Sequence, residues 1–359
     1  MKVLVRVDAG ALIGSGHVRR SLTLADALRA GGAKITFVCR AHPGHLADLI
    51  RAEGHECRLL PVVDASGAGY VAWLGARLEQ DAADAAAIAR ELGHVDLLLT
   101  DHYAIGNDWQ RTVRPAVSWI MAIDDLANRS HDADVVLDQN FGRTAAMYAP
   151  LVPAACRVLA GPRYALLRSE FAAARPAALA RRKNFTGVRR VLVSLGGMDP
   201  QNLTERVVRL LAAARGGQPV IVTTVIGDGR QVEALRRAAA GMDIEVLVGA
   251  SNMAELMRDA DVAIGGMGGT AWERCALGLP TLALIVADNQ RPAAVRMQTA
   301  GLLVDALMPD ELDEDALCRL LTLDLQTYAA LSAAVAAQCD GEGAARVVDA
   351  VQAMVREAA

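Results

Sequence analysis

Short apolar runs alternate with amphipathic stretches in the first half of the chain. The apolar runs predict strands at residues 3–7, 35–39, 57–61, 95–100, 118–123 and 135–137. The stretches between them predict helices at residues 19–29, 46–52 and 71–92, with a short helix near Trp109. Strands that are apolar throughout and separated by helices are typical of a parallel sheet covered on both faces.

The same pattern starts again in the second half of the chain. Further strands are predicted at 190–194, 220–226, 244–248, 262–264 and 281–286, and the acidic segment 310–315 leads into a helical tail without a strand pattern. A basic segment rich in Ala and Pro, at 175–187, reads as a linker or an exposed helix. At roughly 150 residues per domain, 359 residues fit two domains. We assign them to 1–170 and 188–359, with a linker at 171–187.

Two consecutive domains of this kind predict an α/β protein with two doubly wound, Rossmann-like domains and a ligand cleft between them. Open parallel sheets bind their ligands beyond the carboxyl ends of the strands. The loops that follow strands are therefore where catalytic and binding residues are expected.

Composition and charge narrow the functional classes. Hydrophobic residues make up 53% of the chain, but no window approaches the roughly 20 uninterrupted apolar residues that span a membrane. The first strand leads straight into charged residues, so we expect no signal peptide and a cytoplasmic protein. A net charge of -4 argues against sequence-independent nucleic-acid binding.

The cysteine and histidine spacings predict neither a metal site nor a bound cofactor. The six cysteines are far apart and form no Cys-x-x-Cys pair. The seven histidines form no His-x-x-x-His pair, and no third ligand accompanies His42 and His45. We expect a monomer whose cysteines are buried thiols.

The loop after the first predicted strand carries the strongest catalytic candidate, His17. It reads Ile13-Gly14-Ser15-Gly16-His17 and precedes an apolar helical pattern. Gly14 and Gly16 permit backbone conformations and close approaches that a side chain would obstruct. His17 is expected on the first turn of the helix, where the positive end of the helix dipole favours a neutral imidazole that can act as a general base. Asp8, at the strand end, is a candidate to orient the ring.

A purely structural role for His17, as a cap or a packing residue, is the alternative that this loop leaves open. The loop is not Gly-x-Gly-x-x-Gly, because position 19 is Arg19, which weakens a dinucleotide-binding interpretation. It also lacks the Gly-Lys-Thr/Ser ending of a P-loop.

Two glycine-containing loops in the second half predict a nucleotide site. Residues 195–202 follow a strand and precede a helix, so their backbone amides are candidates to receive a phosphate. The stronger element is 265–273, Gly-Gly-Met-Gly-Gly-Thr-Ala-Trp-Glu, which continues through Gly278-Leu279-Pro280 to Asp288-Asn289-Gln290. Its glycines open the helix start to a diphosphate, and Glu273 is placed to accept hydrogen bonds from ribose hydroxyls. A tight turn followed by a solvated Glu273 is the alternative.

The second element resembles the nucleotide-sugar signature of GT-B glycosyltransferases, including the MurG family. Together with the His17 loop, the chain resembles the family of UDP-2,4-diacetamido-2,4,6-trideoxy-β-L-altropyranose hydrolases (PseG). The resemblance covers about residues 1 to 300 and includes segments 100–105, 123–125, 137–140 and 161–171.

The resemblance implies metal-independent, inverting hydrolysis of a UDP-sugar, within the biosynthesis of pseudaminic acid. It makes His17 the base that activates water and Tyr103 a residue that positions water or sugar. The resemblance and the loop patterns together give the expected substrate and UDP-binding residues, which are Asp8, Gly14, Gly16, Asn140, Arg168, Gly197, Asn202, Gly268, Gly269, Thr270, Glu273 and Asn289. Asp124 and Asp125 are interpreted as scaffolding whose side chains point in different directions.

Two alternatives stay open: a GT-B glycosyltransferase that uses a UDP-sugar donor, and a UDP-sugar-binding module without turnover. Two departures from the family pattern bear on sugar specificity. Met267 with the doubled Gly268-Gly269 replaces a stretch that is often rich in Ser and Ala, and the helical tail is longer.

Overall fold

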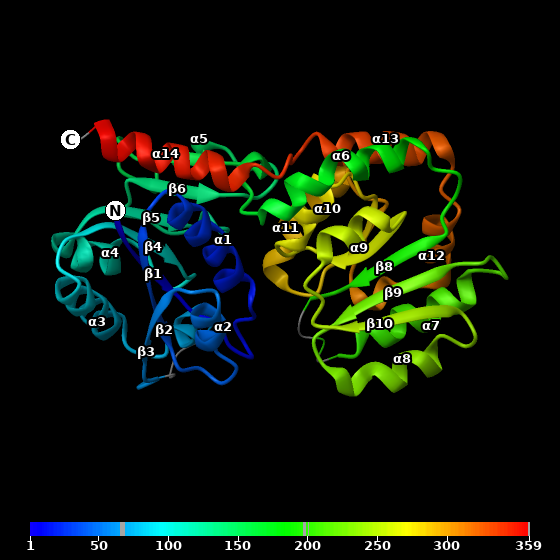
Figure 1. Cartoon of the computed structure of the whole chain (residues 1–359), viewed down its shortest axis with the longest axis horizontal. Coiled ribbons are helices and arrows are strands. Elements are labelled where there is room, and N and C mark those ends of the chain that lie inside the picture. The colour runs from blue at the N-terminus through cyan, green and yellow to red at the C-terminus, as the bar shows by residue number, and fades with distance from the viewer. Residues whose placement is uncertain (65–68, 197–198, 200, 358–359) are drawn as a thin grey trace. The chain divides into compact units, whose positions relative to one another are not determined.

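The computed structural model describes residues 1–64, 69–196, 199 and 201–357. They form two compact units (Figure 1). Unit 1 comprises Met1–Leu166 and the residues from Gly343 onward, and unit 2 comprises Leu167–Glu342.

Unit 1 is built on a parallel sheet, seven-stranded in the described residues, with the order β3-β2-β1-β4-β5-β6-β7. Its strands are β1 (Lys2–Val7), β2 (Lys34–Arg40), β3 (Glu56–Leu60), β4 (Val95–Asp101), β5 (Val117–Ile123), β6 (Val135–Asp138) and β7 (Arg157–Ala160). Its helices are α1 (Gly16–Ala30), α2 (Ala47–Ala52), α3 (Leu78–Glu91), α4 (Asn107–Val113), α5 (Ala145–Tyr148) and α14 (Gly343–Glu357), with 3-10 turns η1 (Gly69–Leu74), η2 (Arg114–Ala116) and η3 (Pro162–Tyr164).

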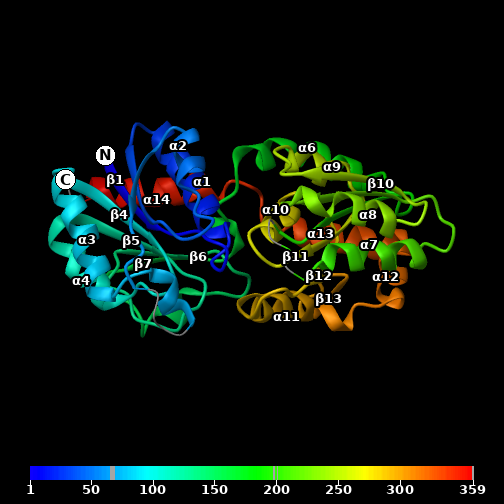
Figure 2. The same ribbon diagram turned by 90° about the horizontal axis from the view of Figure 1, so that it is seen from below.

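Helices cover both faces of this sheet (Figure 2). Alternate side chains of β1, such as Val3, Val5 and Val7, pack against α1, α2 and α14. Leu4 belongs to the opposite core, with residues of α3 and α4. Because successive side chains of a strand point to opposite faces, position parity decides which helix layer a residue meets.

Unit 2 repeats the plan with a parallel sheet whose described strands follow the order β10-β9-β8-β11-β12-β13. The strands are β8 (Arg190–Ser194), β9 (Ile221–Ile226), β10 (Asp243–Val248), β11 (Val262–Gly266), β12 (Thr281–Leu284) and β13 (Asp305–Leu307). The helices are α6 (Ser169–Lys183), α7 (Leu203–Ala214), α8 (Val232–Ala238), α9 (Met253–Asp259), α10 (Thr270–Ala276), α11 (Arg291–Thr299), α12 (Glu314–Leu321) and α13 (Leu325–Ala336), with η4 (Gly229–Gln231), η5 (Asp288–Gln290) and η6 (Pro309–Glu311).

The predicted class, two parallel α/β sheets, is confirmed, but some element assignments differ. The expected helix at 71–92 is η1 followed by α3, and strands β7 and β13 were not predicted. Both missed strands are short, with four and three residues. Both strands also contain partly exposed residues, so neither forms an apolar run that is long enough to recognise in the sequence.

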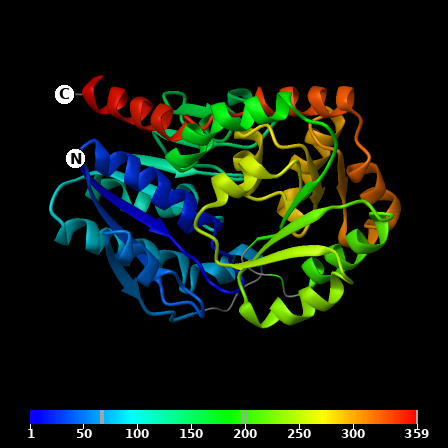
Figure 3. The same ribbon diagram turned by 45° about the vertical axis from the view of Figure 1, so that its right-hand side comes forward.

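The unit boundaries also differ from the predicted domains. Residues 171–187 are not a free linker, because most of them belong to α6, which packs on α9, α10 and α13 in unit 2. The C-terminal helix α14 returns to unit 1 and contacts α1 (Figures 1 and 3). It buries Val347, Val351 and Met354 in the core beside α1. The apolar face of α14 must be buried, but the position of the helix in the sequence does not show which of the two sheets it packs beside.

None of the described helices is long and apolar enough to cross a membrane.

Candidate active site

The loop from β1 to α1 is folded back by one short hydrogen bond. The N–H of Gly14 donates to the carbonyl of Gly10 at 2.8 Å, and Gly14 has φ of +81°, a conformation that favours glycine. Gly16 is exposed and begins α1, and a side chain there would meet no protein atom. The predicted backbone role is thus met at Gly14, while Gly16 leaves open space beside the next residue, His17.

His17 lies in the first turn of α1, as predicted, with 9% of its surface exposed. Its Nδ1 atom lies 2.7 Å from Oδ1 of Asp101, the last residue of β4, whose side chain is fully buried. Burial opposes ionisation of Asp101, but the charges of Arg20 and His17 outweigh it and hold the pKa of this carboxyl well below its usual range. An ionised carboxylate only accepts hydrogen bonds, so Nδ1 carries the proton. In this tautomer, the proton-accepting lone pair of the ring is on Nε2, which has no hydrogen bond within the described part of the chain.

The expectation that Asp8 orients His17 is wrong, and strand parity gives the reason. Val7 pairs with Asp101 across β1 and β4, so Asp101 faces α1 together with Val7. Asp8 is one position further and faces α3. Its carboxylate forms a buried ion pair with Arg6 at 2.8 Å and accepts the backbone N–H of Arg40. Asp8 therefore supports the end of β1 rather than the histidine.

Arg20, one turn after His17 in α1, joins two carboxylates. Its guanidinium donates to both oxygens of Asp101, at 2.6 and 2.7 Å, and to both oxygens of Asp125, at 2.7 and 3.0 Å. Asp125 also accepts the phenol O–H of Tyr103 at 2.8 Å and the side-chain amide of Asn140 at 2.9 Å. One charge network thus fixes His17, Tyr103 and Asn140, which come from three separate segments.

Tyr103 contacts His17 directly. The two rings meet edge to face, with centroids 4.6 Å apart, a favourable arrangement for aromatic pairs. Tyr70 and Trp73 of η1 also pack against Tyr103, with centroids 4.8 and 5.9 Å away. The structure therefore brings together the two predicted catalytic residues and adds an aromatic wall that the sequence did not reveal.

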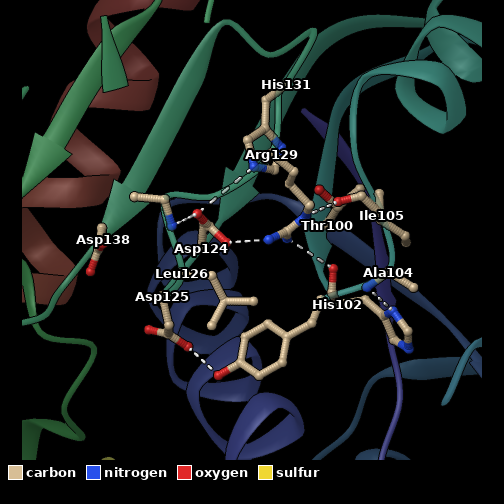
Figure 4. A network of polar contacts seen from close by, with 12 residues as sticks. Thr100, His102, Ala104, Ile105, Asp124, Asp125, Leu126, Arg129, His131 and Asp138 are labelled. Carbon is tan, nitrogen blue, oxygen red and sulfur yellow. Dashed lines mark hydrogen bonds and ion pairs between the residues drawn. The ribbon is translucent and has the colours of Figure 1, made fainter. Parts of the chain in front are cut away.

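Asp124 and Asp125 point in different directions, as predicted (Figure 4). Asp124 faces away from α1 and accepts hydrogen bonds from Arg129 and from the phenol of Tyr148. Arg129 also donates to the carbonyls of Ile105 and His102, so it ties the segment that carries Tyr103 to the end of β5.

The predicted phosphate loop at 195–202 is corrected in part by the structure. The carboxylate of Asp199 accepts the N–H groups of Leu203 and Thr204, both at 2.8 Å. These amides at the start of α7 are satisfied by the protein itself and are not open to a phosphate. Asn202 has a left-handed backbone, with φ of 53°, and its side chain accepts a hydrogen bond from Gln231. Gly197 lies outside the described residues.

The second predicted nucleotide element connects β11 to α10. Gly268 and Gly269 are exposed, and Thr270 and Glu273, both half-buried, lie in the first turns of α10. Gln290 of η5 accepts the N–H of Met267 and thereby links this loop to the one after β12. Asn289, in the same turn, is exposed.

Arg168 lies at the boundary before α6, in unit 2. It forms an ion pair with Glu170 at 2.7 Å, and 44% of its side chain is exposed. It is not part of the His17 network.

Three residues of the His17 network were missed as site residues: Arg20 and Asp101, and Asp125, which we treated as scaffolding. A signal did exist, because Asp101 and Asp125 both follow apolar strands and Arg20 is three positions after His17 on one helix face. In the described residues, no group of three or more His, Cys, Asp or Glu side chains is arranged to hold a metal ion.

The fold is the GT-B class of two Rossmann-like units. MurG of Acinetobacter baumannii superposes with a TM-score of 0.69 at 17% identity, covering 98% of this chain and 99% of that one. The calicheamicin glycosyltransferase CalG4 has a TM-score of 0.60 at 17% identity, covering 98% of this chain and 97% of that one. No family model matches the sequence.

Sequence relatives confirm the resemblance to the PseG hydrolases. The UDP-2,4-diacetamido-2,4,6-trideoxy-β-L-altropyranose hydrolase of Campylobacter jejuni is 25% identical, over 84% of this chain and 97% of its own. An uncharacterised protein of Methanocaldococcus jannaschii is 26% identical over 81% of this chain. This chain spans 57% of the length of that archaeal protein. The Campylobacter jejuni relative is named for hydrolysis of a UDP-linked sugar, and one structure with the same fold, LpCGTa, is a complex with UDP.

Proposed function

We propose that this protein hydrolyses the anomeric C–O bond of a UDP-linked 2,4-diacetamido-2,4,6-trideoxy sugar. The products are UDP and the free sugar, formed with inversion and without a metal ion, in nonulosonic acid biosynthesis. The observation that carries the proposal is the buried Asp101–His17 pair, which leaves Nε2 of His17 as a proton acceptor. The similarity to the Campylobacter jejuni hydrolase supports the choice of substrate.

In the proposed reaction, Nε2 of His17 takes a proton from water as the water oxygen attacks the anomeric carbon. The bond between that carbon and the UDP oxygen breaks, and its electron pair leaves with the β-phosphate. UDP is a good leaving group, so one base is sufficient and a second catalytic carboxylate is not required. Asp101 stabilises the imidazolium that forms, as the acidic member of a triad does.

Tyr103 and Asn140 are proposed to position the sugar or the water next to His17, since both are held by Asp125. The UDP group is proposed to bind unit 2. The diphosphate is assigned to Gly268, Gly269 and Thr270, and the ribose to Glu273. Further proposed contacts to the substrate or the nucleotide are Asn202, Asn289, Arg168 and Gly197.

The test is incubation of the protein with the UDP-sugar alone in water enriched in heavy oxygen. We expect UDP release without an acceptor and heavy oxygen in the sugar product, read by mass spectrometry, with inversion read by NMR. Label in UDP would place the attack at phosphorus and refute the role of His17.

A second candidate is transfer of the sugar to an acceptor, because CalG4, which shares the fold, is named as a glycosyltransferase. His17 would then deprotonate an acceptor hydroxyl. UDP release only after an acceptor is added would favour this function over hydrolysis. UDP-sugar binding without release under either condition would favour a module without turnover.

A further inference from the structure

A positively charged side chain is buried beneath the loop between β11 and α10. Arg274 is 2% exposed, and among the described residues it forms no ion pair with a carboxylate. It donates to the carbonyl of Gly266 at 2.6 Å and to Oγ1 of Thr270 at 3.2 Å, while its buried Nε has no hydrogen-bond partner in the described part of the chain. Burial lowers the pKa of Arg274 to about 10, and the nearby charge of Glu273 offsets this only in part. A buried cation without a compensating carboxylate destabilises the folded protein.

The backbone makes room for this guanidinium. A Cβ atom at Gly265 would lie 2.4 Å from Nη1 of Arg274 and 2.8 Å from its Cζ. Gly265 has no left-handed backbone that would require glycine. The missing side chain at this strand position is therefore explained by the space that Arg274 occupies.

Arg182 provides an internal comparison, because it is also a buried arginine, 4% exposed, with a buried Nε that lacks a partner in the described residues and a pKa lowered by burial. Its guanidinium donates to the carbonyls of Met257, Arg258 and Ala260 at the end of α9. The carboxyl-terminal end of a helix carries partial negative charge, which favours the cation of Arg182 at this position. Arg274 instead reaches back to the start of α10, where the N–H groups are partially positive and the helix dipole disfavours a cation.

We propose that Arg274 is a positioning residue for the diphosphate of the bound nucleotide, whose negative charge compensates the buried cation. This rests on the proposed binding of UDP by unit 2. Arg274 acts through Thr270: it donates to Oγ1, which leaves the hydroxyl hydrogen of Thr270 to be donated to a phosphate oxygen. Its charge also strengthens the electrostatic attraction of the loop for the leaving group.

The test compares Arg274→Met with the matched variant Arg182→Met and the unmodified protein. UDP and uridine are titrated by calorimetry, and the Tm of each ligand-free protein is measured. The unmodified protein is titrated first: absence of UDP binding there refutes the proposed function itself. UDP binding without hydrolysis leaves the Arg274 inference standing.

For Arg274→Met we expect the UDP dissociation constant to rise by about tenfold or more and the uridine constant to change by less than about twofold. Its ligand-free Tm should equal or exceed that of the unmodified protein, because an uncompensated charge is removed. Arg182→Met should show the reverse, a lower Tm with UDP affinity within about twofold.

UDP affinity within about twofold in Arg274→Met would overturn the inference, as would equal losses for UDP and uridine or a lower ligand-free Tm. Gly265→Ala offers an independent check, because its methyl group should displace the guanidinium. It should weaken UDP binding in the unmodified protein and add little in the Arg274→Met background. Additive losses in the double variant would contradict the proposed link.

Discussion

The first strand–loop–helix segment of unit 1 and that of unit 2 share a local order but differ in how the helix start is used. In unit 2, Asp199 caps the first turn of α7 by accepting two backbone N–H groups. In unit 1, Ser15 makes no side-chain cap of α1, and the first turn carries His17 instead. The carboxylate that serves His17, Asp101, comes from β4, 84 residues away in sequence.

This difference teaches that a glycine loop before a helix does not define a ligand site by itself. In the α7 loop, the acidic residue Asp199 caps its own helix, which stabilises the fold. In the α1 segment, the polar side chain of His17 instead belongs to a network that includes Arg20 and Asp125. Substitutions in the His17 network are therefore expected to lower turnover, and loss of the Asp199 cap is expected to lower stability.

The largest effect is expected for His17→Asn. Loss of the proton acceptor should lower kcat for UDP release by about 10²- to 10⁴-fold, because general bases contribute at this scale. The UDP dissociation constant should stay within about twofold, since nucleotide binding is assigned to unit 2. The matched control is His94→Asn, whose side chain is 71% exposed. Normal turnover in His17→Asn would refute the mechanism.

Asp101→Asn should lower kcat by about a hundredfold, because the neutral amide neither fixes the Nδ1 tautomer nor stabilises the imidazolium. It also leaves Arg20 with one carboxylate fewer, so the Tm should fall. The folded-state pKa of Asp101 is depressed, so its contribution to stability is full above the unfolded pKa of about 3.9 and is lost as the pH falls further.

The stability difference between the unmodified protein and Asp101→Asn should therefore be constant near neutral pH and shrink below about pH 4. Urea unfolding at several pH values measures it. Asp96→Asn, near the opposite end of β4, is the control that should retain turnover. A stability difference between the two proteins that grows as the pH falls would show that Asp101 is not held ionised by Arg20 and His17.

Tyr103→Phe should have a smaller effect, about tenfold on kcat. The ring remains against His17, and the hydrogen bond to Asp125 is lost. Steady-state kinetics would show whether KM rises as well, which would assign the phenol to sugar binding. Turnover equal to that of the unmodified protein would limit Tyr103 to a packing role.

The smallest effect on turnover is expected for Asp199→Ala. Loss of the cap should destabilise the protein by about 1 kcal/mol while kcat stays within about twofold. Asp313→Ala removes the comparable cap of α12, where Asp313 accepts the N–H of Ala316, and should have a similar effect on Tm. A large loss of UDP affinity in Asp199→Ala alone would show that the Asp199 side chain itself serves the nucleotide site and is more than a helix cap.

The sequence by itself determined most of the strands and helices and the two glycine-containing loops that follow strands. Apolar runs separated by amphipathic stretches are local patterns, so both parallel sheets followed from them. The glycines around His17 placed it on the first turn of a helix after a strand, and the structure agrees. Glycine at 268 and 269 likewise marked the second loop.

Only the tertiary structure decided which side chains meet. Strand order places β4 beside β1, and the register of Val7 with Asp101 puts that carboxylate, rather than Asp8, on the face that α1 covers. A strand that is apolar on both faces does not show in its sequence which face will meet which helix. The return of α14 to unit 1 and the burial of Arg274 have the same origin, because both depend on surfaces formed by distant segments.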